Sequence, residues 1–234
     1  KELDLSKNIG DGPNFSKEIA DGLKKNKGLV TVNIMGNGIG KEQLSHLQEV
    51  RKNHLTPLVS LCGIADDATE ANLSGLGMDA DDAAVLANEL PKKRELTKLI
   101  MRENGFITKE AGKTLGGMLM TNTTLKELDI SDNYKSTLSS VKDISSFMKG
   151  FAEGISANRA LTSLNISNNN IGQIVPPEGW TKTRFGPAHE QYRHTDGRKQ
   201  DDPPEGWPGK PEGTIAIADA IKNHEALTSL NISS

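Results

Sequence analysis

The chain has 234 residues, a formal net charge of −3 and 25% charged residues. This weak and mixed charge argues against the strongly basic surface typical of a nucleic-acid-binding protein, and no apolar run reaches the roughly 18 residues of a membrane span. The single cysteine, Cys62, excludes an internal disulfide and a cysteine-rich zinc site, so we expect an intracellular protein.

One pattern, L-x-x-L-x-L-x-x-N-x-I, recurs from the first residue to the last. Copies begin at Leu29, Leu96, Leu125 and Leu161, partial copies begin at Lys1 and Leu227, and a weaker copy begins at Glu70. The first residues of the inner L-x-L pairs are Leu3, Val32, Ala71, Leu99, Leu128, Leu164 and Leu230, with a basic spacing of 28 or 29 residues. Such a period indicates one supersecondary unit repeated along the chain.

Each unit is predicted to be a short strand followed by a helix. The L-x-L alternation is typical of a strand, and the residues behind it recur at helical spacing. The expected helical faces are Leu44/Leu47/Val50, Ala83/Leu86/Leu90, Ala111/Leu115/Leu119 and Ile144/Phe147/Phe151/Ile155. Asp79 with Asp82, and Thr108, stand where N-caps are expected. One unit leaves its flanks exposed, so we expect the units to stack edge to edge.

Asparagine recurs where each chain segment leaves its strand, at Asn8, Asn37, Asn104, Asn133 and Asn169. We expect these amides to bond turn backbone groups that would otherwise be buried without partners. In the weak copy Leu76 takes this position.

These units resemble leucine-rich repeats, specifically the strand-plus-helix type of ribonuclease inhibitor and Ran GTPase-activating protein. The resemblance covers residues 1–172 and 212–234 apart from 53–69. It implies an α/β solenoid, a curved horseshoe with a parallel sheet on its concave face and helices on its convex face. We therefore treat 1–234 as one domain of about seven strand copies, with an irregular segment at 53–70 and a rim insertion at 173–211.

The irregular segment begins like a repeat at Leu55, Leu58 and Leu61, but no helical pattern follows it. We interpret it as a distorted repeat start with an extended loop. Cys62 has no basic neighbour that would mark a reactive thiol, so we expect a small buried hydrophobe.

The insertion 173–211 holds seven of the ten prolines and both tryptophans. It falls between the strand and the helix of the sixth repeat and is expected to emerge from the rim. Its candidate partner-binding residues are Trp180, Tyr192, His194 and Trp207. Residues 176–203 faintly resemble a WW module, but Gln200 stands where the second, ligand-binding tryptophan belongs, which argues against proline-motif binding.

Two interpretations compete for the histidines of this insertion. His189, His194 and Asp196 are residue types that bind metals or transfer protons. They lack a supporting helix and a fourth ligand, so we favour a turn centred on Asp196 and Gly197. We expect no metal, no catalytic residue and no cofactor.

Residues between the core aliphatics are expected to form three columns on the concave face. The first is Glu2, Thr31, Glu70, Lys98, Glu127, Ser163 and Ser229; the second is Asp4, Asn33, Asn72, Ile100, Asp129, Asn165 and Asn231; the third is Ser6, Met35, Ser74, Arg102, Ser131, Ser167 and Ser233. The candidate partner-binding residues are Lys98, Ile100, Arg102, Glu127, Asp129, Asn33 and Asn165. An arginine beside an aliphatic anchor is typical of a binding hot spot, whereas opposite charges on neighbouring strands can also neutralise one another.

The columns and chain ends favour a non-enzymatic scaffold that binds a protein partner. Glycans on Asn72, Asn165 and Asn231 would crowd the concave face, so their N-x-S/T sequons do not indicate secretion. Two alternatives remain open: a Ran-type GTPase-activating protein, suggested by the resemblance, and a structural subunit of a large assembly. Both ends lack the polar cap that a solenoid needs, so we expect the natural chain to continue or a partner to cover them.

Overall fold

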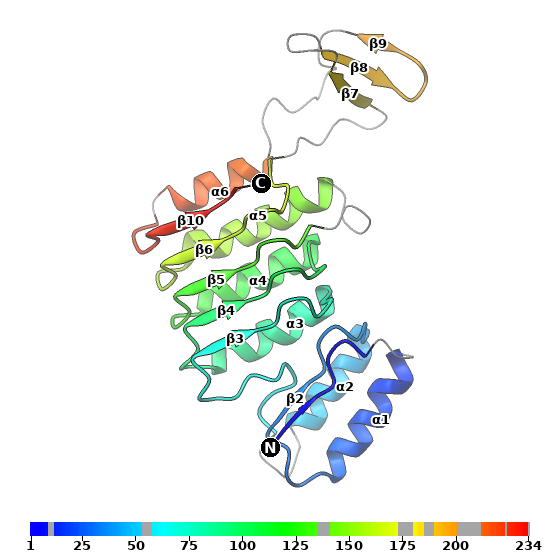
Figure 1. The fold of residues 1–234 in the computed structure, drawn as a ribbon, viewed down its shortest axis with the longest axis vertical. Helices are drawn as coiled ribbons and strands as arrows, with labels where there is room; N and C mark the ends of the chain where they lie inside the picture. Colours follow the sequence, from blue (N-terminus) through cyan, green and yellow to red (C-terminus); the bar gives the residue numbers. More distant parts are fainter. Residues whose placement is uncertain are drawn as a thin grey trace.

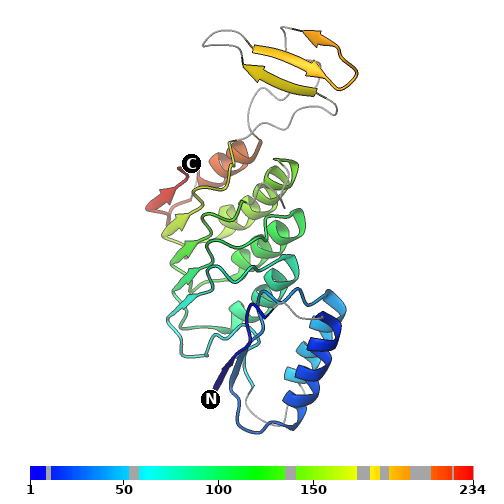
Figure 2. The same cartoon turned by 45° about the vertical axis from the view of Figure 1, so that its right-hand side comes forward.

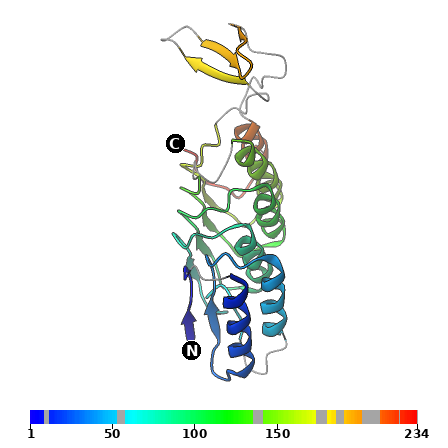
Figure 3. The same cartoon turned by 90° about the vertical axis from the view of Figure 1, so that its right-hand side faces the viewer.

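The computed structural model describes residues 1–8, 12–52, 58–134, 141–172, 180–184, 190–200, 212–222 and 224–233. Its elements are β1 (Glu2–Asp4), α1 (Gly12–Lys25), β2 (Thr31–Asn33), α2 (Lys41–Lys52), β3 (Glu70–Asn72), α3 (Ala80–Glu89), the short 3-10 helix η1 (Leu90–Lys92), β4 (Lys98–Ile100), α4 (Lys109–Thr121), β5 (Glu127–Asp129), α5 (Val141–Ala157), β6 (Ser163–Asn165), β7 (Trp180–Arg184), β8 (Glu190–His194), β9 (Lys199–Gln200), α6 (Glu212–Ile221) and β10 (Ser229–Asn231). The repeat strands form one layer and the helices form the other (Figure 1), and the two layers are seen edge-on in Figure 3. The fold is the predicted α/β solenoid.

The repeat strands are parallel where they pair, and their register aligns the predicted aliphatic positions. Leu3 lies opposite Val32 in a two-stranded sheet of β1 and β2. The central residues of a five-stranded sheet, ordered β3-β4-β5-β6-β10, are Ala71, Leu99, Leu128, Leu164 and Leu230. Because alternate strand residues point to opposite faces, these positions supply the strand side of the core.

The helices cover that core with the faces expected from the sequence. Every residue of the four predicted helical faces is buried. In the middle of the solenoid, the Phe147 ring stacks on Phe151 with centroids 5.5 Å apart and lies 6.2 Å from Phe106. The predicted N-caps are confirmed, since Asp79 forms a capping box with Asp82 and the Thr108 hydroxyl accepts the Ala111 N–H.

The row of strands is interrupted between β2 and β3, which corrects the expectation that all units pair edge to edge. Residues 58–62 run along β2 instead, where the Ser60 and Leu61 carbonyls accept the N–H groups of Val32 and Ile34 at 2.9 and 3.0 Å. The Val59 N–H donates to the Val30 carbonyl at 2.8 Å. Three further N–H groups bond to side chains: Glu89 accepts from Leu61, and the Ser60 hydroxyl accepts from Cys62 and Ile64. The segment therefore offers no regular edge to β3.

No helix lies between residue 58 and β3, as expected for the irregular segment. Leu58 and Leu61 are buried like the leucines of a repeat, whereas Leu55 lies outside the described residues. Cys62 is also fully buried, as predicted, and burial together with the negative charge of Glu89 raises the pKa of its thiol. A thiol held in the neutral form is a poor nucleophile, which agrees with a packing role.

Two buried acidic side chains on α3 join the two sheets. Near the start of α3, Asp82 accepts the Gly36 N–H at 3.1 Å. At the end of α3, Glu89 accepts from the Ser60 hydroxyl at 2.8 Å and lies 3.6 Å from the Arg51 guanidinium. One hydrophobic cluster nevertheless extends across both sheets. The core is therefore continuous although the backbone ladder is not.

A ladder of asparagines runs along one rim and confirms the role expected for these amides. The N–H groups of Asn104 and Asn133 each donate to the side-chain carbonyl of the next asparagine, on Asn133 and Asn169, at 2.7 Å. Each side-chain amide donates in turn to buried carbonyls of its own and the preceding repeat, as Asn104 does to Met101 and Leu73. Polar turn groups are thereby satisfied inside the solenoid.

The insertion forms a separate three-stranded antiparallel sheet of β7, β8 and β9, drawn beyond the β10 end of the solenoid in Figure 2. Gly197, with φ of +95°, lies in the tight turn between β8 and β9, where its N–H donates to the His194 carbonyl. This confirms the predicted turn. Trp207 and His189 lie outside the described residues, and the side chains of Trp180 and Tyr192 are not described.

Candidate functional site

The strand register builds two columns of half-buried and exposed side chains on the concave face. Across the five-stranded sheet, the first column is Glu70, Lys98, Glu127, Ser163 and Ser229, and the second is Asn72, Ile100, Asp129, Asn165 and Asn231. Paired strands lie about 4.8 Å apart, so these side chains form a regular array fixed by the backbone. Across these five strands the register reproduces the first two columns read from the sequence. The third column is corrected, because Met35, Ser131 and Ser167 are buried and do not line the concave face.

Lys98 lies between two acids of the first column. Its ammonium nitrogen is 3.8 Å from one carboxylate oxygen of Glu70 and 3.8 Å from one of Glu127. All three side chains are exposed, so each contact contributes little to stability. The arrangement fixes alternating charge along the column.

Arg102, just after β4, forms a closer ion pair with Asp132. One guanidinium nitrogen lies 2.9 Å from a carboxylate oxygen, and the other oxygen of Asp132 accepts from the Asn168 amide at 2.9 Å. These bonds, the Arg102 bond above all, lower the pKa of Asp132, and the same bond raises the pKa of Arg102. Both side chains are therefore charged at neutral pH and held in place.

Asp129 links two strands on the same face. One of its carboxylate oxygens accepts from the Asn165 amide at 3.0 Å, and the other accepts from the Ser131 hydroxyl at 2.6 Å. Ile100 lies opposite Asp129 in the register, so an aliphatic side chain sits within this polar array. The result is a partly exposed surface of charged and polar side chains around one half-buried aliphatic side chain.

The structure brings together most of the predicted concave residues. Lys98, Ile100, Arg102, Glu127, Asp129 and Asn165 lie on or directly after the adjacent strands β4, β5 and β6. Asn33, in contrast, lies on β2 beyond the interruption of the sheet.

Sequence reasoning missed Asp132 and Asn168 because they follow the third column. Both adopt positive φ, 58° and 56°, a conformation in which Asp and Asn are enriched. That preference was the available signal.

In the insertion, His194 belongs to a local cluster. Its Nδ1 lies 2.9 Å from one carboxylate oxygen of Asp196. The other carboxylate oxygen of Asp196 lies 2.8 Å from the Arg198 guanidinium. Hydrogen bonds, the Arg198 backbone N–H first, lower the pKa of Asp196. These contacts stabilise the turn, and the described residues contain no group of three or more His, Cys, Asp or Glu placed to hold a metal ion.

Comparison with known families identifies the class of the repeats. Two leucine-rich repeat models match, one over residues 160–181 and one over residues 121–133. These matches show leucine-rich repeats at those residues, and the solenoid described above agrees with them.

Comparison with solved structures finds similar folds at low identity. One is a tropomodulin C-terminal domain from Caenorhabditis elegans, at 11% identity and a TM-score of 0.41, covering 72% of this chain and 77% of that one. Another is leiomodin-1 actin-binding site 2, at 18% identity and a TM-score of 0.38, covering 64% of this chain and 77% of that one. No curated protein sequence matches the chain. Within the part of the chain described, no helix is long and apolar enough to span a membrane.

Proposed function

We propose that this protein is a non-enzymatic scaffold that binds another protein through the concave face of β3, β4, β5, β6 and β10. The observation that carries the proposal is the solvent-accessible array centred on the exposed Arg102 and the half-buried Ile100, with its alternating charges. Such a surface is open, so it suits a macromolecular partner better than a small molecule, which requires enclosure. We further propose that the units are of the ribonuclease-inhibitor and Ran GTPase-activating-protein type, since each pairs one short strand with one helix.

Arg102 is the residue that we expect to contribute most to partner binding. Its side chain is 45% exposed and its guanidinium is held by Asp132, so little side-chain entropy is lost when a partner carboxylate adds to it. Ile100, the last residue of β4 and two residues before Arg102, supplies apolar contact area. Arginines beside apolar anchors are enriched among residues that dominate interfaces.

The test compares two charge reversals at ion-paired cations. Arg102→Glu reverses one of the two cations of the array, Lys98 being the other. Lys149→Glu reverses a helix-face cation that is likewise exposed and paired, with Glu212 at 2.6 Å. Proteins captured by each immobilised variant are quantified by mass spectrometry. We expect Arg102→Glu to lose partners that Lys149→Glu keeps. Retention of all partners by Arg102→Glu would show that the concave array is not the binding surface.

The insertion is proposed as a second contact, through Trp180, Tyr192, His194 and Trp207. A variant lacking residues 173–211 tests this contact in the same capture experiment, and it should retain a subset of partners at reduced yield. Single-turnover GTP hydrolysis with small GTPases tests the non-enzymatic part of the proposal, and no acceleration is expected.

A further inference from the structure

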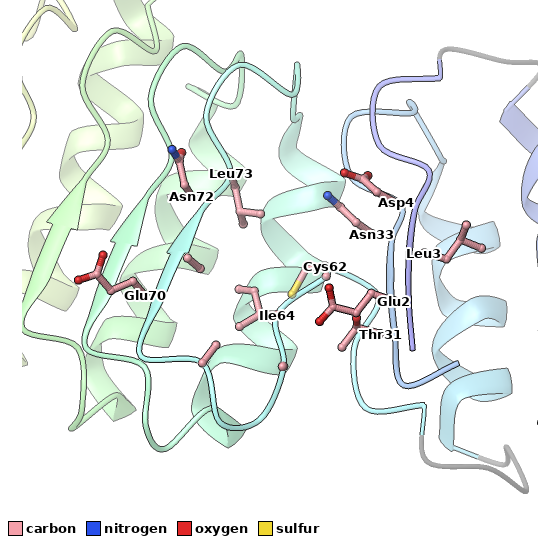
Figure 4. A pocket seen from close by; sticks show the side chains of 14 residues that line it. Glu2, Leu3, Asp4, Thr31, Asn33, Cys62, Ile64, Glu70, Asn72 and Leu73 are labelled. Carbon is pink, nitrogen blue, oxygen red and sulfur yellow. The ribbon is translucent and has the colours of Figure 1, made fainter. Parts of the chain in front are cut away.

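The interruption of the sheet leaves a hollow on the concave side, between β2 and β3. It has a volume of about 330 Å³ and is lined by residues of β1, β2, the segment that follows residue 61, and β3. Figure 4 shows Glu2 and Thr31 beside Cys62 and Ile64 on one side, and Glu70 and Asn72 on β3 on the other. We call this hollow the sheet-break groove.

One wall of the sheet-break groove is a strand edge with free backbone groups. The Thr69 carbonyl accepts from the Thr97 N–H, and the Leu73 N–H donates to the Ile100 carbonyl. The backbone N–H and C=O groups of residues 69, 71 and 73 therefore point toward β4. Because strand residues alternate in direction, the N–H and C=O groups of Glu70 and Asn72 point into the groove. Among the described residues, no strand pairs with this edge of β3.

The groove has an apolar floor and an acidic rim. Ile64 and Leu73 are buried beneath it, at 3% and 5% exposed, and Ala65, Ala68 and Ala71 line it further. The exposed acids Glu2, Asp4 and Glu70 surround this floor, and the 14 residues that line the groove include no lysine, arginine or histidine. Of the three acids, Glu70 is close to a cation, Lys98 at 3.8 Å. The groove therefore keeps a net negative charge.

We propose that the sheet-break groove binds an extended protein segment in which basic and aliphatic residues alternate, as an added strand on the free edge of β3. The segment's backbone pairs with Glu70 and Asn72, which is the recognition mode of β-strand addition. Its alternate side chains point down and up, so aliphatic ones meet Ile64 and Leu73 while basic ones meet the acidic rim. This site lies at the β3 edge of the concave face and shares Glu70 with the first column, but it does not require Arg102.

The first test measures binding of a designed probe to the whole chain. The probe is a fluorescent peptide of about six residues, a typical strand length, with alternating lysine and valine. A matched peptide of alternating glutamate and valine is the comparison. By fluorescence anisotropy we expect the lysine peptide to bind, with an affinity that falls as the salt concentration rises. We expect no binding of the glutamate peptide. Equal binding of both peptides, or of neither, overturns the proposal.

Two variants assign the binding to the edge and to the rim. Asn72→Pro removes a free N–H without removing a bond to β4, so affinity should fall by about tenfold or more. The double change Glu2→Gln with Asp4→Asn should weaken binding, whereas Glu153→Gln with Asp219→Asn, the same charge change on exposed positions of α5 and α6, should not. Identical affinity in all variants overturns the proposal.

Hydrogen exchange keeps the proposal testable should Asn72→Pro fail to fold. In the unaltered protein, saturating lysine peptide should slow exchange at the Glu70 and Asn72 amides. Unchanged exchange at the Glu70 and Asn72 amides would contradict the proposal. Concentration-dependent dimerisation that Asn72→Pro abolishes would also contradict it, because the β3 edge would then bind a second copy of the chain. Neither outcome affects the Arg102 experiment, so failure here is distinguishable from failure of the proposed scaffold function.

Discussion

The ladder asparagines show how single side chains hold this solenoid together. Asn104 is fully buried, and its side chain accepts the Met78 N–H and donates to the carbonyls of Leu73 and Met101. Removing such a side chain leaves several buried polar groups without partners, each at a cost of about 1–3 kcal/mol. Each ladder asparagine therefore serves two repeats.

We predict that Asn104→Leu lowers the free energy of unfolding by about 3 kcal/mol or more. The control is Asn231→Leu, on the exposed strand β10, which should cost less than about 1 kcal/mol. Urea denaturation followed by circular dichroism measures both. Equal effects of the two changes would show that the ladder contributes nothing specific.

In the repeat where Leu76 replaces the ladder asparagine, Asp82 supplies a hydrogen-bond acceptor to the preceding repeat. Its carboxylate accepts the Gly36 N–H across the junction and the Asp79 N–H within its own cap. Burial, and then the negative charge of Asp79, raises its pKa from 3.8 to about 7. Between these two pH values, Asp82 keeps its proton in the folded protein but has lost it in the unfolded chain.

This raised pKa makes stability depend on pH with a defined sign. The contribution of protonated Asp82 is complete below about pH 4 and is lost as the pH rises toward 7. Asp82→Asn keeps an acceptor for both N–H groups but does not titrate. Between pH 4 and 7, the unfolding free energy of the natural protein should fall by about 2–4 kcal/mol relative to that of the variant. Parallel pH curves for the two proteins would contradict the assignment.

At the scale of elements, α4 and α5 are in contact through glycines. A Cβ on Gly116 would lie 2.1 Å from the Gly150 carbonyl oxygen, and one on Gly154 would lie 2.2 Å from that of Gly116. Backbones this close leave no room for a side chain, so the glycines set the distance between the two helices. Adjacent Gly117, in contrast, has nothing within 4 Å of its Cβ position.

Neighbouring glycines on α4 should therefore respond in opposite directions to alanine. Gly116→Ala should destabilise the protein by about 2 kcal/mol or more, because α4 and α5 must separate. Gly117→Ala should stabilise it by about 0.5–1 kcal/mol, because alanine favours the helix and meets no neighbour. Thermal unfolding by calorimetry distinguishes the two, and destabilisation by both would contradict the packing described.

The sequence predicted the elements well because their signals are local. The L-x-L pairs located the repeat strands, and helical spacing located the buried faces of α2, α3, α4 and α5. The pairing of residues 58–62 with β2 was not predictable, because it depends on Glu89, 28 residues after Leu61. The Arg102–Asp132 pair joins residues of two different repeats, so the positive-φ preference at Asp132 could have indicated that residue but not its partner.

At the scale of the whole molecule, the backbone ladder and the hydrophobic core have different extents. The core passes through both sheets without a gap, whereas strand pairing stops at β2 and resumes at β3. Helix α3 spans this junction with Asp82 and Glu89. A broken ladder over a continuous core leaves one internal strand edge available inside an otherwise regular solenoid.

Amide hydrogen exchange of the unliganded protein tests this central claim most directly. Strand β4 is paired on both sides, so the amides from Lys98 to Met101 should all exchange slowly. In β3 the account predicts alternation, with slow exchange at Ala71 and Leu73 and fast exchange at Glu70 and Asn72. Uniform protection along β3 would show that its second edge is paired, and uniform fast exchange in β3 and β4 would show that the repeats do not stack through their strands.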